Sequence, residues 1–457
     1  MIIIKPNPRF LGLLTLTLLI SACGASYKLL WEEQIIERSF ALVVTDGNVK
    51  MIGQLDDQTT VTTYDTEGDV VSSHQYPVDL GQWYSDANTL FRFPDGAFFV
   101  GTSLENLTFV DDNEQTYWQG LSLADLGVGD SGSVSINSAT VFEDRLYILG
   151  RFFIEDDTGS FGNTDAIFFV VDRNGDVHMT HREDKMSVLG GPVVGDSGEA
   201  AFTIRYFGSH MGDNGEKSAL VVFDSDLALA SRTESTEYVY VHSIQGDNVS
   251  LLNTSGLESL RNDTGKRFTV YEPYMLSDGA GNTYLWGANA NYDNCEADLC
   301  FYYPWLAKIN SAGDVLFVRE DIAASSVTNT GQIFHVLNNK VKLADSGGVH
   351  WAYSSQTLAG IDSVLEPGGL ATYIRFSENS VHRRLSEDGI VESEFNEPSN
   401  YVTRRLAGTV GGVDPLTNVV SPGFCGVRDF ETIGVNLVTL NRYCAEQSSR
   451  YHLSYYE

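Results

Sequence analysis

Apolar and polar residues alternate along most of this chain, which is the period-two pattern of strands with one buried face. Aromatic and β-branched residues fill the alternating segments, and no segment after residue 22 has a sustained helical stripe with caps. Short polar turns, usually with a glycine, separate the segments. The pattern therefore predicts an all-β fold made of hairpins.

One hairpin signal recurs: an alternating strand, an Asp or Asn, a short turn and a second alternating strand. The clearest copies span 61–71, 167–179 and 305–318, and weaker ones centre on Asp111, Asp224, Asp263 and Ser377. A second hairpin precedes each copy, as in 90–101, 140–150 and 275–287. Two hairpins supply the four strands of a propeller blade, so we predict a single β-propeller of seven blades.

The ends of the chain leave the blade number open between seven and eight. Counting the pairs of hairpins assigns seven blades to residues 39–385 and leaves a strand-rich unit at 386–457. That unit is either an eighth blade, with segment 23–38 supplying its closing strand, or a strap over a seven-bladed ring. Spacing alone does not choose between them.

Two stretches resemble a known repeat. Residues 278–287 read D-x-x-G-N-x-Y-x-x-G, and residues 305–316 read W-L-A-K-I-N-x-x-G-D-x-L. Together they resemble the SBBP-type bacterial β-propeller repeat. Residues 165–176 are similar to its second half, although Val170 and Val171 stand where the family favours Lys and an aliphatic residue. The resemblance implies a structural repeat without shared catalytic residues.

The first 22 residues have the three parts of a signal peptide: Lys5 and Arg9, an apolar run from Phe10 to Ile20, and small residues before Cys23. The run is too short to span a bilayer, which needs about 20 residues. Residues 20–23 (I-S-A-C) resemble a lipobox, which implies removal of residues 1–22 and acylation of Cys23. Gly24 in place of Asp implies the outer membrane of a Gram-negative cell. The alternative is an ordinary secretory peptide followed by a chance cysteine.

Charge excludes one class of partner. Cleavage before Cys23 removes two cations and leaves 27 basic against 61 acidic residues. Such a surface repels phosphate, so we expect no nucleic-acid partner. The acidity allows opportunistic binding of calcium, but we expect no dedicated cofactor and no built metal site.

Four further cysteines, Cys295, Cys300, Cys425 and Cys444, form an even set in an exported chain and predict two disulfides. The local pairings, Cys295 with Cys300 and Cys425 with Cys444, need the least chain closure. A zinc site is the competitor, but the spacings lack the short knuckles of zinc ribbons.

Insertions concentrate on one face of the expected ring. We predict long loops between the second and third strands of four blades, at 151–164, 207–217, 288–303 and 353–369. Long loops in compact domains are commonly functional. The richest is 288–303, whose candidate ligand-binding residues for a sugar or peptide are Tyr292, Asp293, Glu296, Asp298, Tyr302 and Tyr303. The alternative is that a disulfide only staples this loop and the tyrosines cover blade edges.

Catalytic and metal signals are weak. His210, with Asp213 to orient it and Tyr206 as an acid, is the best candidate base, although isolated loop histidines are commonly structural. His178 and His181 lie three apart on a predicted strand and so face opposite ways. Asp172-x-Asn174-x-Asp176 has calcium-like spacing, but its glycine is misplaced for an EF-hand, and a turn explains it. Gly195-Asp196-Ser197-Gly198 recurs at 129–132 and is interpreted as turn chemistry.

The sequence thus favours an envelope lipoprotein, bound to membrane through Cys23, whose propeller is a non-enzymatic platform for an envelope protein or glycan. The alternative is an extracellular polysaccharide hydrolase or lyase with its site at the centre of the ring. Two carboxylates, or His with Tyr and Arg, converging there would favour the enzyme. No such group is visible in the sequence.

Overall fold

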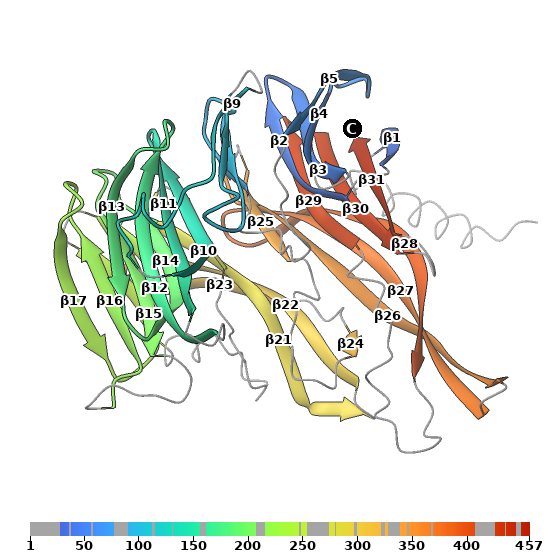
Figure 1. Cartoon of the computed structure of the whole chain (residues 1–457). Helices are drawn as coiled ribbons and strands as arrows, with labels where there is room; N and C mark the ends of the chain where they lie inside the picture. Colours follow the sequence, from blue (N-terminus) through green and yellow to red (C-terminus); the bar gives the residue numbers. More distant parts are fainter. Residues whose placement is uncertain are drawn as a thin grey trace, which may run out of the picture.

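In the computed structural model every regular element among the described residues is a strand (Figure 1). The structure describes residues 28–35, 38–55, 58–76, 90–111, 115–129, 131–155, 161–206, 215–245, 248–253, 274–278, 280–296, 299–320, 325–327, 339–344, 347–366, 369–406, 426–434, 436–444 and 449–457. No helix in this part of the chain is long and apolar enough to cross a membrane.

The strands form sheets in which sequence neighbours pair antiparallel. The first three blades are β2 (Arg38–Thr45), β3 (Asn48–Leu55), β4 (Gln58–Tyr64) and β5 (Val70–Tyr76); β6 (Leu90–Arg92), β7 (Phe98–Val100), β8 (Thr108–Val110) and β9 (Thr116–Gln119); and β10 (Gly132–Phe142), β11 (Arg145–Glu155), β12 (Phe161–Asp172) and β13 (Val177–Glu183). A fourth follows with β14 (Met186–Val194), β15 (Ala200–Tyr206), β16 (Ser218–Phe223) and β17 (Leu229–Ser235).

The second half of the ring is less regular. A hairpin, β18 (Val239–Gln245) with β19 (Asn248–Asn253), precedes a blade of β20 (Tyr274–Ser277), β21 (Asn282–Glu296), β22 (Leu299–Asn310) and β23 (Val315–Glu320), with β24 (Ser325–Val327) added to β22. The next blade holds β25 (Lys340–Leu343), β26 (Val349–Glu366), β27 (Gly369–Leu385) and β28 (Val391–Leu406). The boundary that we drew at residue 385 therefore falls inside a blade, because β28 pairs with β27.

The last blade contains both ends of the described chain. β29 (Gly426–Ile433), β30 (Asn436–Cys444) and β31 (Ser449–Tyr456) are completed by β1 (Leu29–Ile35), which pairs antiparallel with β31. The C-terminal strands thus form a blade and not a strap. The all-β prediction is confirmed, as is a propeller of seven four-stranded blades, with the hairpin β18–β19 beside them.

The core lies between blades. One apolar cluster joins β6–β9 to β10–β13 through residues such as Phe99, Phe109 and Phe152, and another joins β10–β13 to β14–β17 through Phe168 and Phe202. Each blade buries both faces against its neighbours, as radial stacking requires.

Many of the tight turns between described strands share one geometry. In ten of them the N–H of the first residue bonds to the carbonyl of the fifth, from Asp65 with Asp69 to Ser386 with Ile390. The fourth residue commonly has a positive φ, which favours glycine, as at Gly68 and Gly313. This is the type I turn with a G1 bulge that the recurrent Asp and Gly predict. The copies at Asp111 and Asp224 are confirmed, and the one at Asp263 lies outside the described residues. The one at Ser377 is wrong, since Ser377 lies in β27 and pairs with Thr357.

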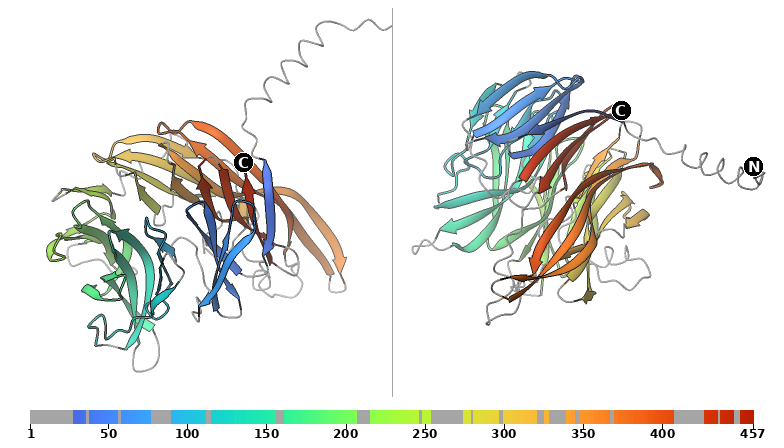
Figure 2. Two further views of the ribbon diagram at one scale, coloured as in Figure 1. Left: turned by 90° about the horizontal axis from the view of Figure 1, so that it is seen from above. Right: turned by 90° about the vertical axis from the view of Figure 1, so that its right-hand side faces the viewer.

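Two hairpins extend far beyond the ring on the side away from the C-terminus, β21–β22 and β26–β27 (Figures 1 and 2). We expected irregular loops at 288–303 and 353–369, and this was wrong. The segments continue as paired strands up to Glu296 with Leu299 and Glu366 with Gly369. Backbone pairing satisfies their peptide groups without help from the ring.

Candidate functional site

The structure places most of the predicted ligand-binding residues on one extended hairpin. Tyr292, Asp293 and Glu296 belong to β21, and Tyr302 and Tyr303 belong to β22. The register sets Tyr303 opposite Asn289 and Tyr302 opposite Ala290. Asp298 lies outside the described residues, so the ligand set remains a prediction.

Three of the four cysteines predicted to form disulfides lie near strand ends. Cys295 is near the end of β21, Cys300 is near the start of β22, and Cys444 ends β30. Cys425 and the lipidation candidate Cys23 lie outside the described residues, so both disulfides and the acylation stay predictions.

The weak catalytic candidates are not assembled by the described residues. The Tyr206 hydroxyl donates to the Glu234 carboxylate at 3.0 and 3.1 Å. Burial and this bond raise the pKa of Tyr206, which makes it a poorer proton donor. His210 and Asp213 lie outside the described residues.

The histidines on β13 have separate partners. His178 Nε2 lies 3.0 Å from Asp172 Oδ2, and His181 Nε2 lies 2.8 Å from Glu183 Oε1. Within the described ranges no group of three His, Cys, Asp or Glu residues could hold a metal ion.

The calcium-like segment is a turn. Asp172 Oδ1 accepts the backbone N–H groups of Asn174 at 2.8 Å and Asp176 at 3.1 Å. Asp278 Oδ1 does the same for Ala280 and Asn282 at 2.9 and 3.0 Å. The carboxylate that begins each turn therefore binds its own backbone.

The strongest charged cluster lies on inner strands, and our reading of the sequence missed it. Asp429 on β29 is 3% exposed and faces Lys342 on β25 at 3.0 Å, Lys340 at 3.6 Å and Arg92 on β6 at 3.2 Å. The Leu42 N–H on β2 also donates to Asp429, at 2.8 Å. This central cluster thus ties the inner strands of four consecutive blades together.

Glu431 completes the central cluster. Its carboxylate lies 2.8 Å from Lys342 Nζ and also bonds Arg92. Three cations therefore meet two carboxylates, a local excess of positive charge in a strongly acidic chain. Burial alone would raise the pKa of Asp429, but Lys340, Lys342 and Arg92 outweigh burial and hold it well below its usual value.

This ionisation argues against glycosidase chemistry at the central cluster. Two carboxylates do converge there, which is the arrangement that would favour an enzyme. A glycosidase, however, needs one carboxyl with a raised pKa to protonate the leaving oxygen. Asp429 is instead held ionised, and Glu431 is bound to two cations. The arrangement fixes inner strands by charge, and its buried carboxyl Asp429 is not suited to act as the general acid.

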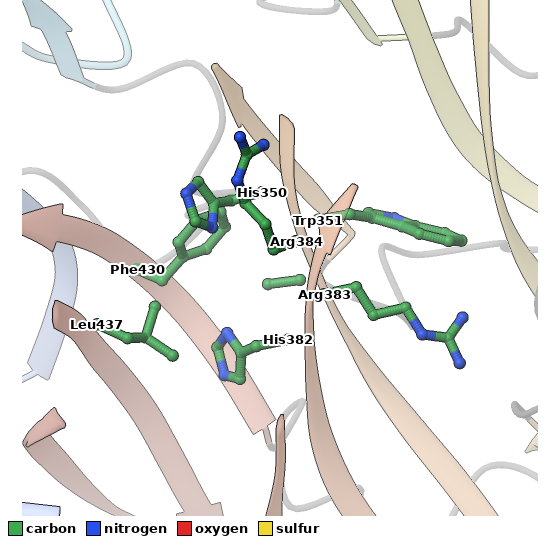
Figure 3. A pocket seen from close by; sticks show the side chains of 8 residues that line it. His350, Trp351, His382, Arg383, Arg384, Phe430 and Leu437 are labelled. Atoms are coloured by element: carbon green, nitrogen blue, oxygen red, sulfur yellow. The ribbon is translucent and has the colours of Figure 1, made fainter. Parts of the chain in front are cut away.

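A shallow cleft opens next to the central cluster, between β26–β27 and β29–β30 (Figure 3). It is lined by His350, Trp351, Ala352, His382, Arg383, Arg384, Phe430 and Leu437 and has room for about one water molecule. Arg383 extends to the same side as Trp351, with its guanidinium 5.9 Å from the Trp351 ring centroid, and bonds Glu394 at 2.8 Å (Figure 3).

His382 is a buried lining residue of this cleft. It is 6% exposed, and neither ring nitrogen has a hydrogen-bond partner within the described residues. Burial, with a smaller contribution from His350, lowers the pKa of His382 to about 3. A histidine so hard to protonate is a poor general base.

Comparison with known proteins identifies no family for this chain. No family model and no curated protein match the sequence. Among solved structures, the Vanderwaltozyma polyspora Nup133 β-propeller domain is 10% identical, with a TM-score of 0.35 over 93% of this chain and 99% of that one. Drosophila Semaphorin 1b is 9% identical, with a TM-score of 0.34 over 94% and 87%. The Synechocystis apocarotenoid oxygenase is 10% identical, with a TM-score of 0.30 over 83% and 96%.

Proposed function

We propose that this chain is a cell-envelope lipoprotein, bound to the outer membrane of a Gram-negative cell through Cys23, whose propeller is a non-enzymatic binding platform for an envelope protein or glycan. Lipobox-like residues 20–23 support the anchor. Two or more acyl chains hold a protein on a bilayer stably.

The observation that carries the binding role is the length of the β26–β27 hairpin. β26 has 18 residues and β27 has 17, whereas the strands of the blade β2–β5 have seven or eight. β25 pairs only with Val349–Ala352, so residues 353–366 extend beyond it. A hairpin of this length exceeds the strands of blade β2–β5, and its cross-strand pairing orders a surface in advance, which lowers the entropy lost on binding.

The central cluster supports the same choice. It fixes the inner strands of four blades by charge while holding Asp429 ionised. A rigid ring that presents ordered hairpins suits recognition and not bond cleavage.

The test removes the hairpin tip and keeps the blade. Replacing residues 364–371 by Asn-Gly preserves the Ser363–Thr372 pair and every residue of β27 that pairs with β28. The matched control replaces residues 154–163 by Asn-Gly and preserves the Phe153–Thr164 pair on β11–β12. Both variants should keep the thermal unfolding midpoint of the parent within a few degrees.

Chemical cross-linking in cells, followed by purification of the tagged chain, supplies the readout. We expect cross-linked adducts with the parent and with the control, and we expect the adducts to be lost when residues 364–371 are replaced. An unchanged adduct pattern in that variant would contradict the assignment of the hairpin as the binding element.

A further inference from the structure

Exposed apolar side chains gather beside the tight turns. Val70 and Val71 begin β5, Val315 and Leu316 begin β23, and Ile390 and Val391 flank the start of β28. Val71 and Ile390 are each 59% exposed. Each pair follows a turn between the third and fourth strands of its blade, so all lie at the rim of one face, the turn face.

The first strand adds a fourth pair at the same level. Leu29 and Leu30 begin β1 and are also exposed. Leu29 pairs with Tyr456, and Lys28 and Glu457 exchange two backbone hydrogen bonds of 2.9 and 3.0 Å. The ends of β1 and β31 thus meet where other blades have a tight turn.

These four pairs occupy consecutive blades: β20–β23, β25–β28, the closing blade and β2–β5. We call them the apolar arc. In the other three four-stranded blades, the first residue of the fourth strand does not belong to the arc. It is Leu229, which is exposed, in β14–β17, Thr116 in β6–β9, and Val177, which is half-buried, in β10–β13. A run of exposed apolar pairs differs from the single exposed residues that are normal on protein surfaces.

The proposed lipid attachment is close to this arc along the sequence. Four residues separate Lys28 from Cys23, and the five Cα–Cα steps between them span at most about 18 Å. The anchored cysteine therefore stays close to the turn face, at the blade that carries Leu29 and Leu30. The extended hairpins leave the ring on the opposite side (Figure 2).

We propose that the apolar arc docks on the surface of the bilayer that holds the lipid anchor, so that the hairpins point away from the membrane. The inference rests on the anchoring in the proposed function and adds an orientation to it. Apolar side chains that enter the acyl boundary gain the transfer free energy that holds peripheral proteins on lipid. Acidic turn residues such as Asp65 and Glu67 make a zwitterionic bilayer the suitable probe, because anionic lipid would repel them.

The test compares two positions on one strand. Val71 and Gln75 are both exposed on β5 and lie near its opposite ends. In separate variants of the full acylated chain, each of these two residues is replaced by p-azidophenylalanine, and the azide is coupled to the fluorophore NBD. Each labelled variant is then reconstituted in phosphatidylcholine vesicles. We expect NBD emission to rise and shift to the blue at position 71 and to stay unchanged at position 75.

A second variant keeps the inference falsifiable. Val315→Asp, Leu316→Asp and Ile390→Asp combined should abolish the signal at position 71 while the unfolding midpoint is retained, because all three side chains are exposed. Equal NBD emission at both positions, or an NBD signal at position 71 that persists in the triple aspartate variant, would overturn the docking of the apolar arc without bearing on the lipid anchor. Mass spectrometry of the same preparation reads the anchor separately: an unacylated Cys23 would overturn the anchoring on which docking rests.

Discussion

Asp429 shows how much one buried side chain contributes to the stability of this ring. It is buried and accepts hydrogen bonds from the backbone of Leu42 and Phe430 besides its three cations. Removing the charge of one member of a buried ionic group leaves the others uncompensated, at a cost of about 3–5 kcal/mol.

We therefore expect Asp429→Asn to lower the free energy of unfolding in urea by about 3–5 kcal/mol. Asp226→Asn is the matched control, because Asp226 is an exposed turn residue whose backbone N–H bonds Asp224. A loss below about 0.5 kcal/mol, typical of surface substitutions, would show that the central cluster does not support the inner strands.

Two buried histidines predict acid sensitivity above the range where carboxylates titrate. Burial lowers the pKa of His242 to about 4 and that of His382 to about 3. The unfolded chain, with histidine near 6.5, binds more protons at lower pH, so stability falls as pH drops below about 6.5. At pH 5 each of the two histidines should lower the free energy of unfolding by about 2 kcal/mol relative to its value well above pH 6.5.

His382→Phe should halve this loss between pH 6.5 and 5, and adding His242→Phe should abolish it. Urea unfolding at fixed pH steps measures the effect. A parent chain equally stable at pH 5 and pH 7 would exclude the buried neutral state of these rings.

Residue chemistry was predictable only where it is local. The aspartates that begin turns were identified from neighbouring glycines, because acceptor and donors lie within five residues of each other. Asp429 carries no such signal, since its partners come from residues 42, 92, 340 and 342 and meet only when the ring closes.

At the scale of elements, outer strands bind the turns of the next blade. Trp31 on β1 donates to the Thr66 carbonyl at 2.9 Å, and Trp118 on β9 donates to the Arg173 carbonyl at 2.8 Å. Phe317 on β23 packs against Gly389 in the same way. A Cβ at Gly389 would lie 2.6 Å from Phe317, whereas one at Gly313 would meet nothing within 4 Å.

Gly389→Ala should therefore destabilise the chain more than Gly313→Ala. Both residues have a positive φ, near 74° and 84°, so each substitution carries a backbone cost of about 1 kcal/mol. Only Gly389→Ala also displaces an aromatic ring, which should add about 1–3 kcal/mol in urea unfolding. Equal losses in the free energy of unfolding for the two variants would show that the contact between Phe317 and Gly389 does not stabilise the packing of these two blades.

Hairpins were predictable in the blades but not beyond them. Turn chemistry marks each short hairpin, whereas residues 353–369 combine small, polar and apolar residues that suggested a loop. The bulge between Leu358 and Gly360 also interrupts the alternation of β26. Pairing across the hairpin, which a single strand does not reveal, makes this segment regular.

At the scale of the whole molecule, β1 closes the ring and connects it to the anchor. Closure joins residues more than 400 positions apart, as Leu29 with Tyr456 shows. Period-two alternation predicted the propeller, and spacing left the role of the last unit open. The same closure places the N-terminal side of β1 on the turn face and leaves the extended hairpins on the other.

The most direct test of the account places one photo-cross-linking amino acid at position 364 on β26, or at position 226 in a turn, of the acylated chain in cells. Irradiation followed by mass spectrometry should give envelope protein or glycan adducts from position 364 and none from position 226. Adducts from position 226 alone would place the binding surface on the turn face and contradict the account.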